Sequence, residues 1–191
     1  MRAGLVLVLF LSAFTTCALA AQQGSTWVRE EKSDPLHKTA YSEFTLEGKY
    51  LVPPKDRNAE APMLILQCKE DAHNRDGGKA SGRLLAGFLD VDAALDFREG
   101  NLPVEFRLDD GKLQEADWSS SNDSGGATFG YKDFEKLLYG HTSSHKEDTS
   151  PAVRKVILGV PEHLGTEIEA EFDMPDPGEV AEVCGVVGHK K

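Results

Sequence analysis

Apolar and polar residues alternate along two segments of this chain, residues 104–109 and 166–174. A period of two is typical of a β-strand that turns one face to the core and the other to solvent. The charged residues of both segments fall on the predicted outer face. The inward positions are Val104, Phe106, Leu108, Ile168, Ala170 and Phe172.

Two further patterns predict hairpins. Residues 63–66 are apolar without interruption, residues 71–82 are rich in Asn, Asp and Gly, and residues 84–91 are again mostly apolar. This order predicts a buried strand, a polar turn and a return strand. An Asp-Gly pair at 110–111 is a strong turn signal, and it predicts a second hairpin that returns over 113–118.

Helical spacing is confined to two short stretches. Apolar residues within 131–138 recur on one helical face and predict a short amphipathic helix, and 179–184 predicts one helical turn. Strands that come in hairpins favour a mainly β fold, either an antiparallel β-sandwich or a barrel-like sheet, with one or two short helices. We expect Trp118, Phe106 and Phe172 in its core.

The first residues read as an export leader. Arg2 precedes a long apolar run, and the small-x-small triplet at 18–20 predicts cleavage before Ala21. The run is short for a membrane span, and no second one follows, so we expect no transmembrane segment after cleavage. The predicted organisation is a signal peptide over 1–20, a loose N-terminal arm over 21–40, a single β-rich domain over 41–185 and a frayed tail over 186–191. The expected location is periplasmic or secreted.

Export changes how the cysteines are interpreted. Cys17 would leave with the leader, so Cys68 and Cys184 remain, an even pair in an oxidising compartment. We expect one disulfide between them. Two free thiols or a metal site are the alternatives, although two thiolates without a nearby histidine make a poor zinc site.

The charge balance is acidic, with a formal net charge of −11 that becomes −12 when Arg2 is removed. Nucleic acid and anionic membranes repel such a surface, so neither is expected as a partner. The acidity suits a basic partner, or it serves only to keep a secreted protein in solution.

Candidate chemistry is sparse. No motif predicts catalytic residues, and no cofactor is expected. His141 and His145 stand four residues apart, a spacing that suits a metal only on a helix, but their polar surroundings favour a solvated loop. Acidic residues gather at 109–123 without the spacing of an EF-hand calcium loop.

Several short motifs in this order resemble a known family. They lie at residues 64–68, 87–89, 104–111, 118–123 and 127–129. The order resembles the small periplasmic proteins associated with type VI secretion, the VasI/TagO-like group. Trp118, Ser121 and Asp123 fit that group's tryptophan-x-x-serine-x-aspartate segment, and the resemblance extends over residues 62–185. It implies an all-β domain with no known catalytic residues and a binding or accessory role.

Three functions are therefore weighed. The first is an exported, non-enzymatic domain that binds another protein of the cell envelope or the extracellular space. The second is a small periplasmic metal-dependent hydrolase that uses the loop at 141–148. The third is a proteinaceous inhibitor of a secreted hydrolase, whose acidic face mimics a substrate.

Overall fold

Ten β-strands form one antiparallel sheet in the computed structural model, which describes residues 25–34, 39–55, 58–70, 82–120, 126–140, 152–163 and 165–185. The strands are β1 (Val28–Asp34), β2 (Thr39–Glu47), β3 (Lys49–Val52), β4 (Met63–Glu70), β5 (Gly82–Asp90), β6 (Asn101–Leu108), β7 (Gln114–Ser120), β8 (Gly126–Phe129), β9 (Lys155–Pro161) and β10 (Glu167–Asp173). The helices are α1 (Tyr131–Tyr139) and α2 (Gly178–Val183). The predicted fold class is confirmed: mainly β, antiparallel, with two short helices.

The sheet curls because one bent strand belongs to both of its halves. The strand order is β1-β2-β4-β5-β8-β7-β6-β9-β10-β3, and only Gly48 separates β2 from β3 along the chain. A β-carbon on Gly48 would lie 2.6 Å from the Phe172 ring and 2.8 Å from the Glu171 carbonyl oxygen, so only glycine fits where the strand bends against β10. Since β2 pairs with β4 and β3 pairs with β10, the last strands return to the first. The sheet is therefore barrel-like.

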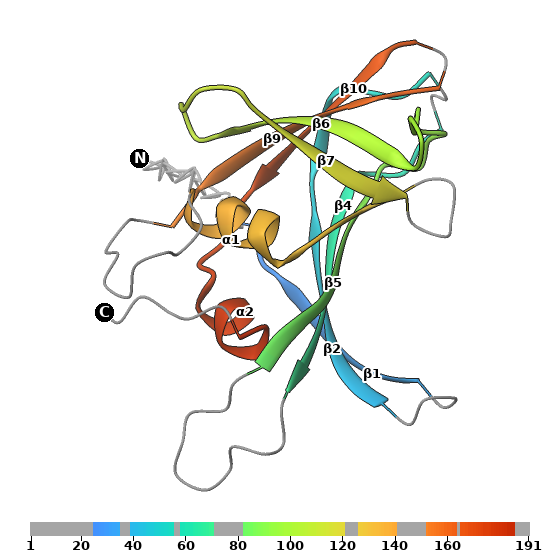
Figure 1. Ribbon diagram of the computed structural model, residues 1–191. Helices are drawn as coiled ribbons and strands as arrows, with labels where there is room; N and C mark the ends of the chain where they lie inside the picture. Colours follow the sequence, from blue (N-terminus) through green and yellow to red (C-terminus); the bar gives the residue numbers. More distant parts are fainter. Residues whose placement is uncertain are drawn as a thin grey trace, which may run out of the picture.

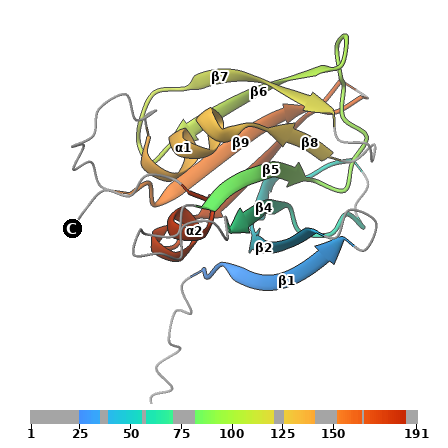
Figure 2. The ribbon, with the colours of Figure 1, turned by 60° about the horizontal axis from the view of Figure 1, so that its bottom comes forward.

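The two helices cover one end of the curled sheet. Figure 2 shows β7 and β6 on one side of α1, and β5, β4, β2 and β1 on the other. Helix α1 turns Phe134, Leu137 and Leu138 inward, and all three are buried. In Figure 1, β2, β4 and β5 run along the molecule, whereas β6, β7 and β9 cross its upper part. Inward residues of both strand sets and of the helices form a single core.

The segment expected to be a loose arm is instead partly a strand. Val28–Asp34 forms β1, which pairs over its whole length with β2, so the expectation is wrong for these residues. Trp27, just before β1, packs against the core. The sequence of β1 is mostly charged and shows no alternation of apolar and polar residues. For this reason the sequence pattern did not predict a strand there. Charged residues are common on edge strands because they discourage pairing with other chains.

A buried carboxylate stabilises the pairing of β3 with β10, which closes the sheet and is called the closing seam here. Glu171 was expected to face solvent, yet it is only 7% exposed. Its Oε1 lies 2.7 Å from Lys49 Nζ of β3 and 3.3 Å from Lys155 Nζ of β9. The hydrogen bond from Lys49, with the bond from Lys155 and the charge of both lysines, lowers the pKa of Glu171 below its ordinary 4.5, against the opposing effect of burial. Glu171 thus links three strands where the sheet closes.

Replacing Glu171 with glutamine is expected to lower the free energy of unfolding by about 1 kcal/mol at neutral pH, because the lysines are largely exposed and their attraction is screened. A carboxylate whose pKa is lowered by folding stabilises above its unfolded pKa and loses that effect as the pH falls through its folded pKa. The difference between wild type and Glu171→Gln should therefore shrink as the pH falls below 4.5. Urea unfolding at several pH values measures it.

Glu169→Gln is the matched control. Glu169 lies on the same strand and forms no ion pair with the residues that the structure describes. Its replacement should change stability little at any pH. Equal losses in the two variants, or a Glu171→Gln difference that does not change with pH, would contradict the role of the seam.

Candidate functional site

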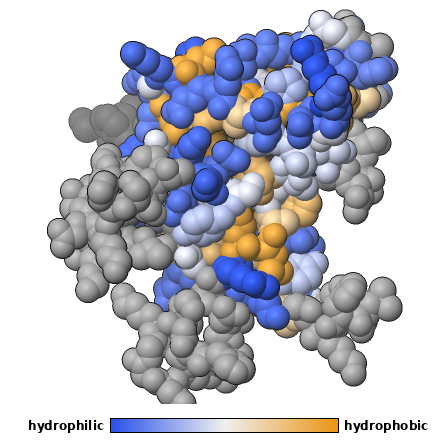
Figure 3. Space-filling model, viewed as in Figure 1, coloured by the Kyte–Doolittle hydropathy of each residue, from blue (hydrophilic) through white to orange (hydrophobic). Residues whose placement is uncertain are grey.

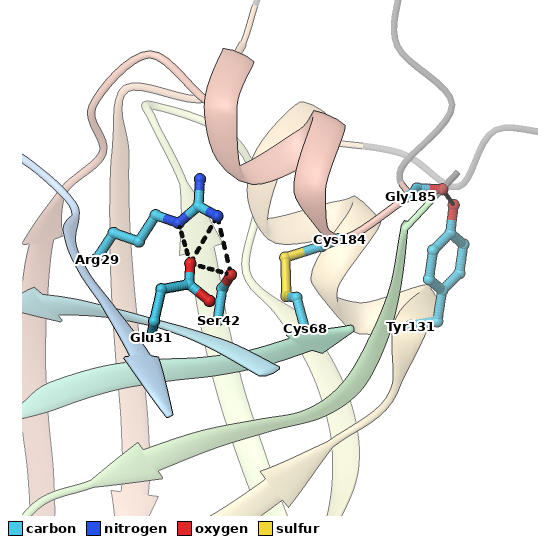
Figure 4. The surroundings of a disulfide bond; sticks show 7 residues. All are labelled: Arg29, Glu31, Ser42, Cys68, Tyr131, Cys184 and Gly185. Atoms are coloured by element: carbon cyan, nitrogen blue, oxygen red, sulfur yellow. Dashed lines mark hydrogen bonds and ion pairs between the residues drawn. A yellow bond between two sulfur atoms is a disulfide. The ribbon is translucent and has the colours of Figure 1, made fainter. Parts of the chain in front are cut away.

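A disulfide joins the sheet to the end of the chain. Cys68 lies in β4 and Cys184 directly follows α2, and their sulfur atoms are 1.91 Å apart, which confirms the predicted pair. Both residues are fully buried. The bond holds α2 against the inner side of β4, at the end of the sheet that the helices cover (Figure 4).

A polar cluster lies beside this bond, on the inner side of the edge strand. Arg29 Nε donates to Glu31 Oε1 at 2.9 Å, and Arg29 Nη2 donates to Ser42 Oγ at 3.0 Å. Ser42 Oγ donates in turn to Glu31 Oε1 at 2.8 Å (Figure 4). Arg29 Nη1 reaches Glu179 of α2 at 2.9 Å, and its guanidinium carbon lies 5.6 Å from the Phe44 ring centroid. Arg29 therefore connects β1, β2 and α2.

Electrostatics in the cluster favours the charged forms. The hydrogen bonds from Ser42 and Arg29 lower the pKa of Glu31. The hydrogen bond to Glu179 is the largest cause of the raised pKa of Arg29. Ser42 is buried, and its hydroxyl donates to the Glu31 carboxylate; no histidine among the described residues hydrogen-bonds to it, so within this part of the chain it is not set up as a nucleophile. The arrangement anchors an edge strand and a helix.

Carboxylates gather on the outer face of the other half of the sheet. Glu105 of β6 and Glu169 of β10 both stand opposite Gly159 of β9, and the Glu167 side chain lies over that glycine. Burial, followed by the negative charges of Glu105 and Glu169, raises the pKa of Glu167. None of the three carboxylates of this acidic group (Glu105, Glu167, Glu169) forms an ion pair with a described residue.

The residues predicted for the core all lie there. Trp118 is 1% exposed, and its ring centroid is 4.7 Å from that of Phe129. Phe106 and Phe172 are equally buried. The indole N–H of Trp118 is buried and has no acceptor among the described residues.

The candidate metal residues cannot be placed. His141 and His145 lie outside the described residues, as do Ser121 to Asp123 of the family motif. Asp109 is engaged elsewhere, since its Oδ1 accepts from the backbone amides of Arg154 and Lys155, both at 2.9 Å. Within the described ranges, no three His, Cys, Asp or Glu side chains converge as metal ligands would.

The face in Figure 3 is mostly hydrophilic, with apolar areas in its upper part and in its lower centre. Leu85 of β5 is 42% exposed. Tyr131, at the start of α1, is also exposed, and its hydroxyl donates to the Gly185 carbonyl at 3.4 Å (Figure 4). The helical pattern over 131–138 counted Tyr131 among the apolar positions, yet the structure exposes it. Sequence patterns did not single out Leu85 or Arg29, because their surroundings depend on pairings between distant segments.

Fold and site together define a class: a mainly β domain with a barrel-like antiparallel sheet and a buried disulfide that anchors its C-terminal helix. Comparison with protein-family models, with curated proteins and with solved structures found no match for this chain. Neither of the two helices in the described part of the chain is long and apolar enough to cross a membrane.

Proposed function

We propose that this chain is an exported, non-catalytic domain, periplasmic or secreted, that binds another protein of the envelope or the extracellular space. The observation that carries the proposal is the buried disulfide between β4 and the end of α2. Such bonds persist in oxidising compartments and are rare in the cytosol. The apolar run and small-x-small triplet of the first twenty residues support the same destination.

The site chemistry supports binding over catalysis. The best-formed polar group, Arg29 with Glu31 and Ser42, is satisfied internally and lies between secondary-structure elements. An activated nucleophile needs a base within hydrogen-bond reach, and Ser42 faces a carboxylate that already accepts from Arg29. What the described surface offers instead is charged and apolar area on the strands of a barrel-like sheet.

Export is tested by expressing the full chain in a Gram-negative host and analysing the cell fractions by intact mass. We expect a product that starts at Ala21 and is lighter than its reduced form by the two thiol hydrogens of Cys68 and Cys184. A cytosolic product that keeps its leader, or one with both thiols free, would contradict the proposal.

Binding is tested with the oxidised mature chain coupled to a resin and exposed to an envelope extract. The control resin carries the same chain after reduction and alkylation, which removes the disulfide but keeps the composition. We expect a protein that only the oxidised chain retains, and that binds again when both are purified. Retention of nothing specific would count against this function.

The acidic group on the outer face favours a second candidate, an inhibitor of a secreted hydrolase. Glu105, Glu167 and Glu169 present negative charge without a lysine or arginine among them. A complex steered by that charge should associate more slowly at high salt. Glu105→Gln with Glu169→Gln should slow association as well, whereas Asp173→Asn, at the end of β10, should not. Association that does not depend on salt would contradict the inhibitor and leave the protein-binding domain as the remaining candidate function.

The association with type VI secretion remains a prediction from the sequence resemblance. Its motif residues Trp118 and Ala127 are buried, which accords with structural roles. Genes for secretion machinery next to the gene of this chain would support the association, and a neighbourhood without them would remove its basis.

A further inference from the structure

A row of uncharged residues crosses the outer side of the sheet. The pairing register aligns Thr45 of β2 with Ile65 of β4, Ile65 with Phe88 of β5, and Phe88 with Thr128 of β8. All four are half-buried. Both helices lie against the inner side of these strands, so neither covers the row (Figures 1 and 2). In a chain with a net charge of −11, such a row is unusual on a surface.

Residues of opposite charge lie at the two ends of the outer face that carries this row. Glu47 and Asp90 lie at one end, on either side of Met63. Lys69 and Arg83 pair across β4 and β5 at the other end. Glu47, Lys69 and Arg83 have no ion-pair partner among the described residues, and Asp90 accepts only from the Asp92 amide at 3.1 Å. The two ends are about 24 Å apart along β5.

We call this surface the bipolar face. It consists of Glu47 and Asp90 at its acidic end, Lys69 and Arg83 at its basic end, and Thr45, Ile65 and Phe88 between them.

We propose that the bipolar face binds the bipolar face of a second copy of this chain. A two-fold axis that crosses β4 near Leu66 and β5 near Gly87 reverses the strand direction and keeps the strand order. Arg83 then meets Asp90 of the second copy, and Asp90 meets Arg83 of that copy. Lys69 approaches Glu47 of the second copy in the same way. Every unneutralised charge of the face finds an opposite charge, as an isologous interface requires. Ile65 and Phe88 lie next to the axis, opposite Gln67 and Ala86 of the second copy, and the nearby Glu43 carboxylate is already paired with Lys32.

Self-association through the edge strand is less favourable. An antiparallel pair of β1 strands about a two-fold places one residue opposite its own copy, and the central candidates are Glu30, Glu31 and Lys32. Like charges directly opposite destabilise such a pair. Lys32 also forms ion pairs with Glu43 and Glu30 already. The face is therefore the surface that suits a second copy.

The interface should be weak. Four strands at about 4.8 Å spacing and a length of about 24 Å give roughly 400–500 Å² per copy, below the area of stable dimers. The net charge of the chain also repels a second copy. At about 0.15 M salt this repulsion is screened beyond about 8 Å, whereas charges in contact still attract. We expect a monomer–dimer equilibrium with a Kd in the range of about ten to a few hundred micromolar.

Sedimentation equilibrium of the mature chain at about 0.15 M salt, from about 5 to about 500 µM, tests the proposal. Arg83→Asp and Asp90→Arg should each raise the Kd at least about tenfold, because each places like charges opposite each other twice. An equimolar mixture of the two variants should associate at least as tightly as wild type. In the mixed dimer the introduced aspartate of one variant faces the introduced arginine of the other, and the native Asp90 and Arg83 that remain face each other.

Two controls separate the local contact from net charge. Lys112→Asp and Asp110→Arg make the same charge changes in the turn between β6 and β7, and they should leave the Kd unchanged. Because the mixture is expected to recover association, misfolding of the single variants cannot imitate the result. A wild type that stays monomeric at about 500 µM would overturn the proposal. So would single variants that associate like wild type, or a mixture that fails to recover, since either outcome points to another surface.

Discussion

A chain with Cys68→Ala and Cys184→Ala is expected to lose about 4–5 kcal/mol of unfolding free energy, measured by urea unfolding against the oxidised wild type. The bond closes a loop over a sequence separation of 116 residues. In the chain-entropy model, a loop of that size restricts the unfolded chain strongly. The bond also fixes the end of α2, whose Val180, Ala181 and Val183 are buried in the same core. A loss of less than about 1 kcal/mol would contradict this account.

The same bond should resist reduction in the folded protein. Both cysteines are fully buried between α2 and β4, so a thiol reagent reaches the sulfurs only after α2 detaches. We expect slow release of thiols by dithiothreitol in buffer and fast release in urea, followed with a thiol-reactive dye. Arg29→Ala, which removes the link between Glu179 and β1, should speed release in buffer. Equal rates in buffer and in urea would show that the bond is accessible without opening.

Strand positions followed from the sequence wherever one face is buried and the other solvated. The alternation in residues 104–108 and 167–173 became β6 and β10, and the Asp-Gly turn became the connection between β6 and β7. These signals are local, since period two and turn chemistry need only neighbouring residues. The disulfide also followed, because the predicted loss of Cys17 with the leader leaves only two cysteines.

Pairings between distant strands could not be read in this way. The register of β5 with β8 and of β6 with β9 sets the order of the sheet, and nothing in the alternation specifies it. Closure through Gly48 depends on Phe172, which is far along the chain. Periodicity places a residue on a face, but it does not choose the strand beside it.

The site residues show the same limit. Glu167, Glu169 and Glu171 look equivalent along β10, yet only Glu171 lies between two lysines, because β3 and β9 flank it in this register. Arg29 and Glu31 looked like loop charges, and they became a structural cluster once β1 paired with β2. The structural role of a charged residue depends on its neighbours in space, and a single sequence does not give these.

Trp118→Ala is expected to cost about 3–5 kcal/mol of unfolding free energy, as the loss of a large side chain from a packed core does. Trp118 is 1% exposed and packs at 4.7 Å on Phe129, whose ring lies directly over Gly87. A β-carbon on Gly87 would clash with that ring, so Phe129 is packed closely between Trp118 and the backbone of β5. Urea unfolding followed by circular dichroism measures the loss.

Trp118→Phe should cost much less, about 1–2 kcal/mol. It leaves a smaller cavity and keeps an aromatic contact with Phe129, and it removes an indole N–H that is buried without an acceptor. Trp27→Phe provides the control and makes Trp118 the only tryptophan, since the chain has two. In that variant the fluorescence emission of Trp118 should be blue-shifted in the folded state and shift to longer wavelength on unfolding. Equal destabilisation by Trp118→Phe and Trp118→Ala, or emission typical of an exposed indole, would show that Trp118 does not fill the core as described.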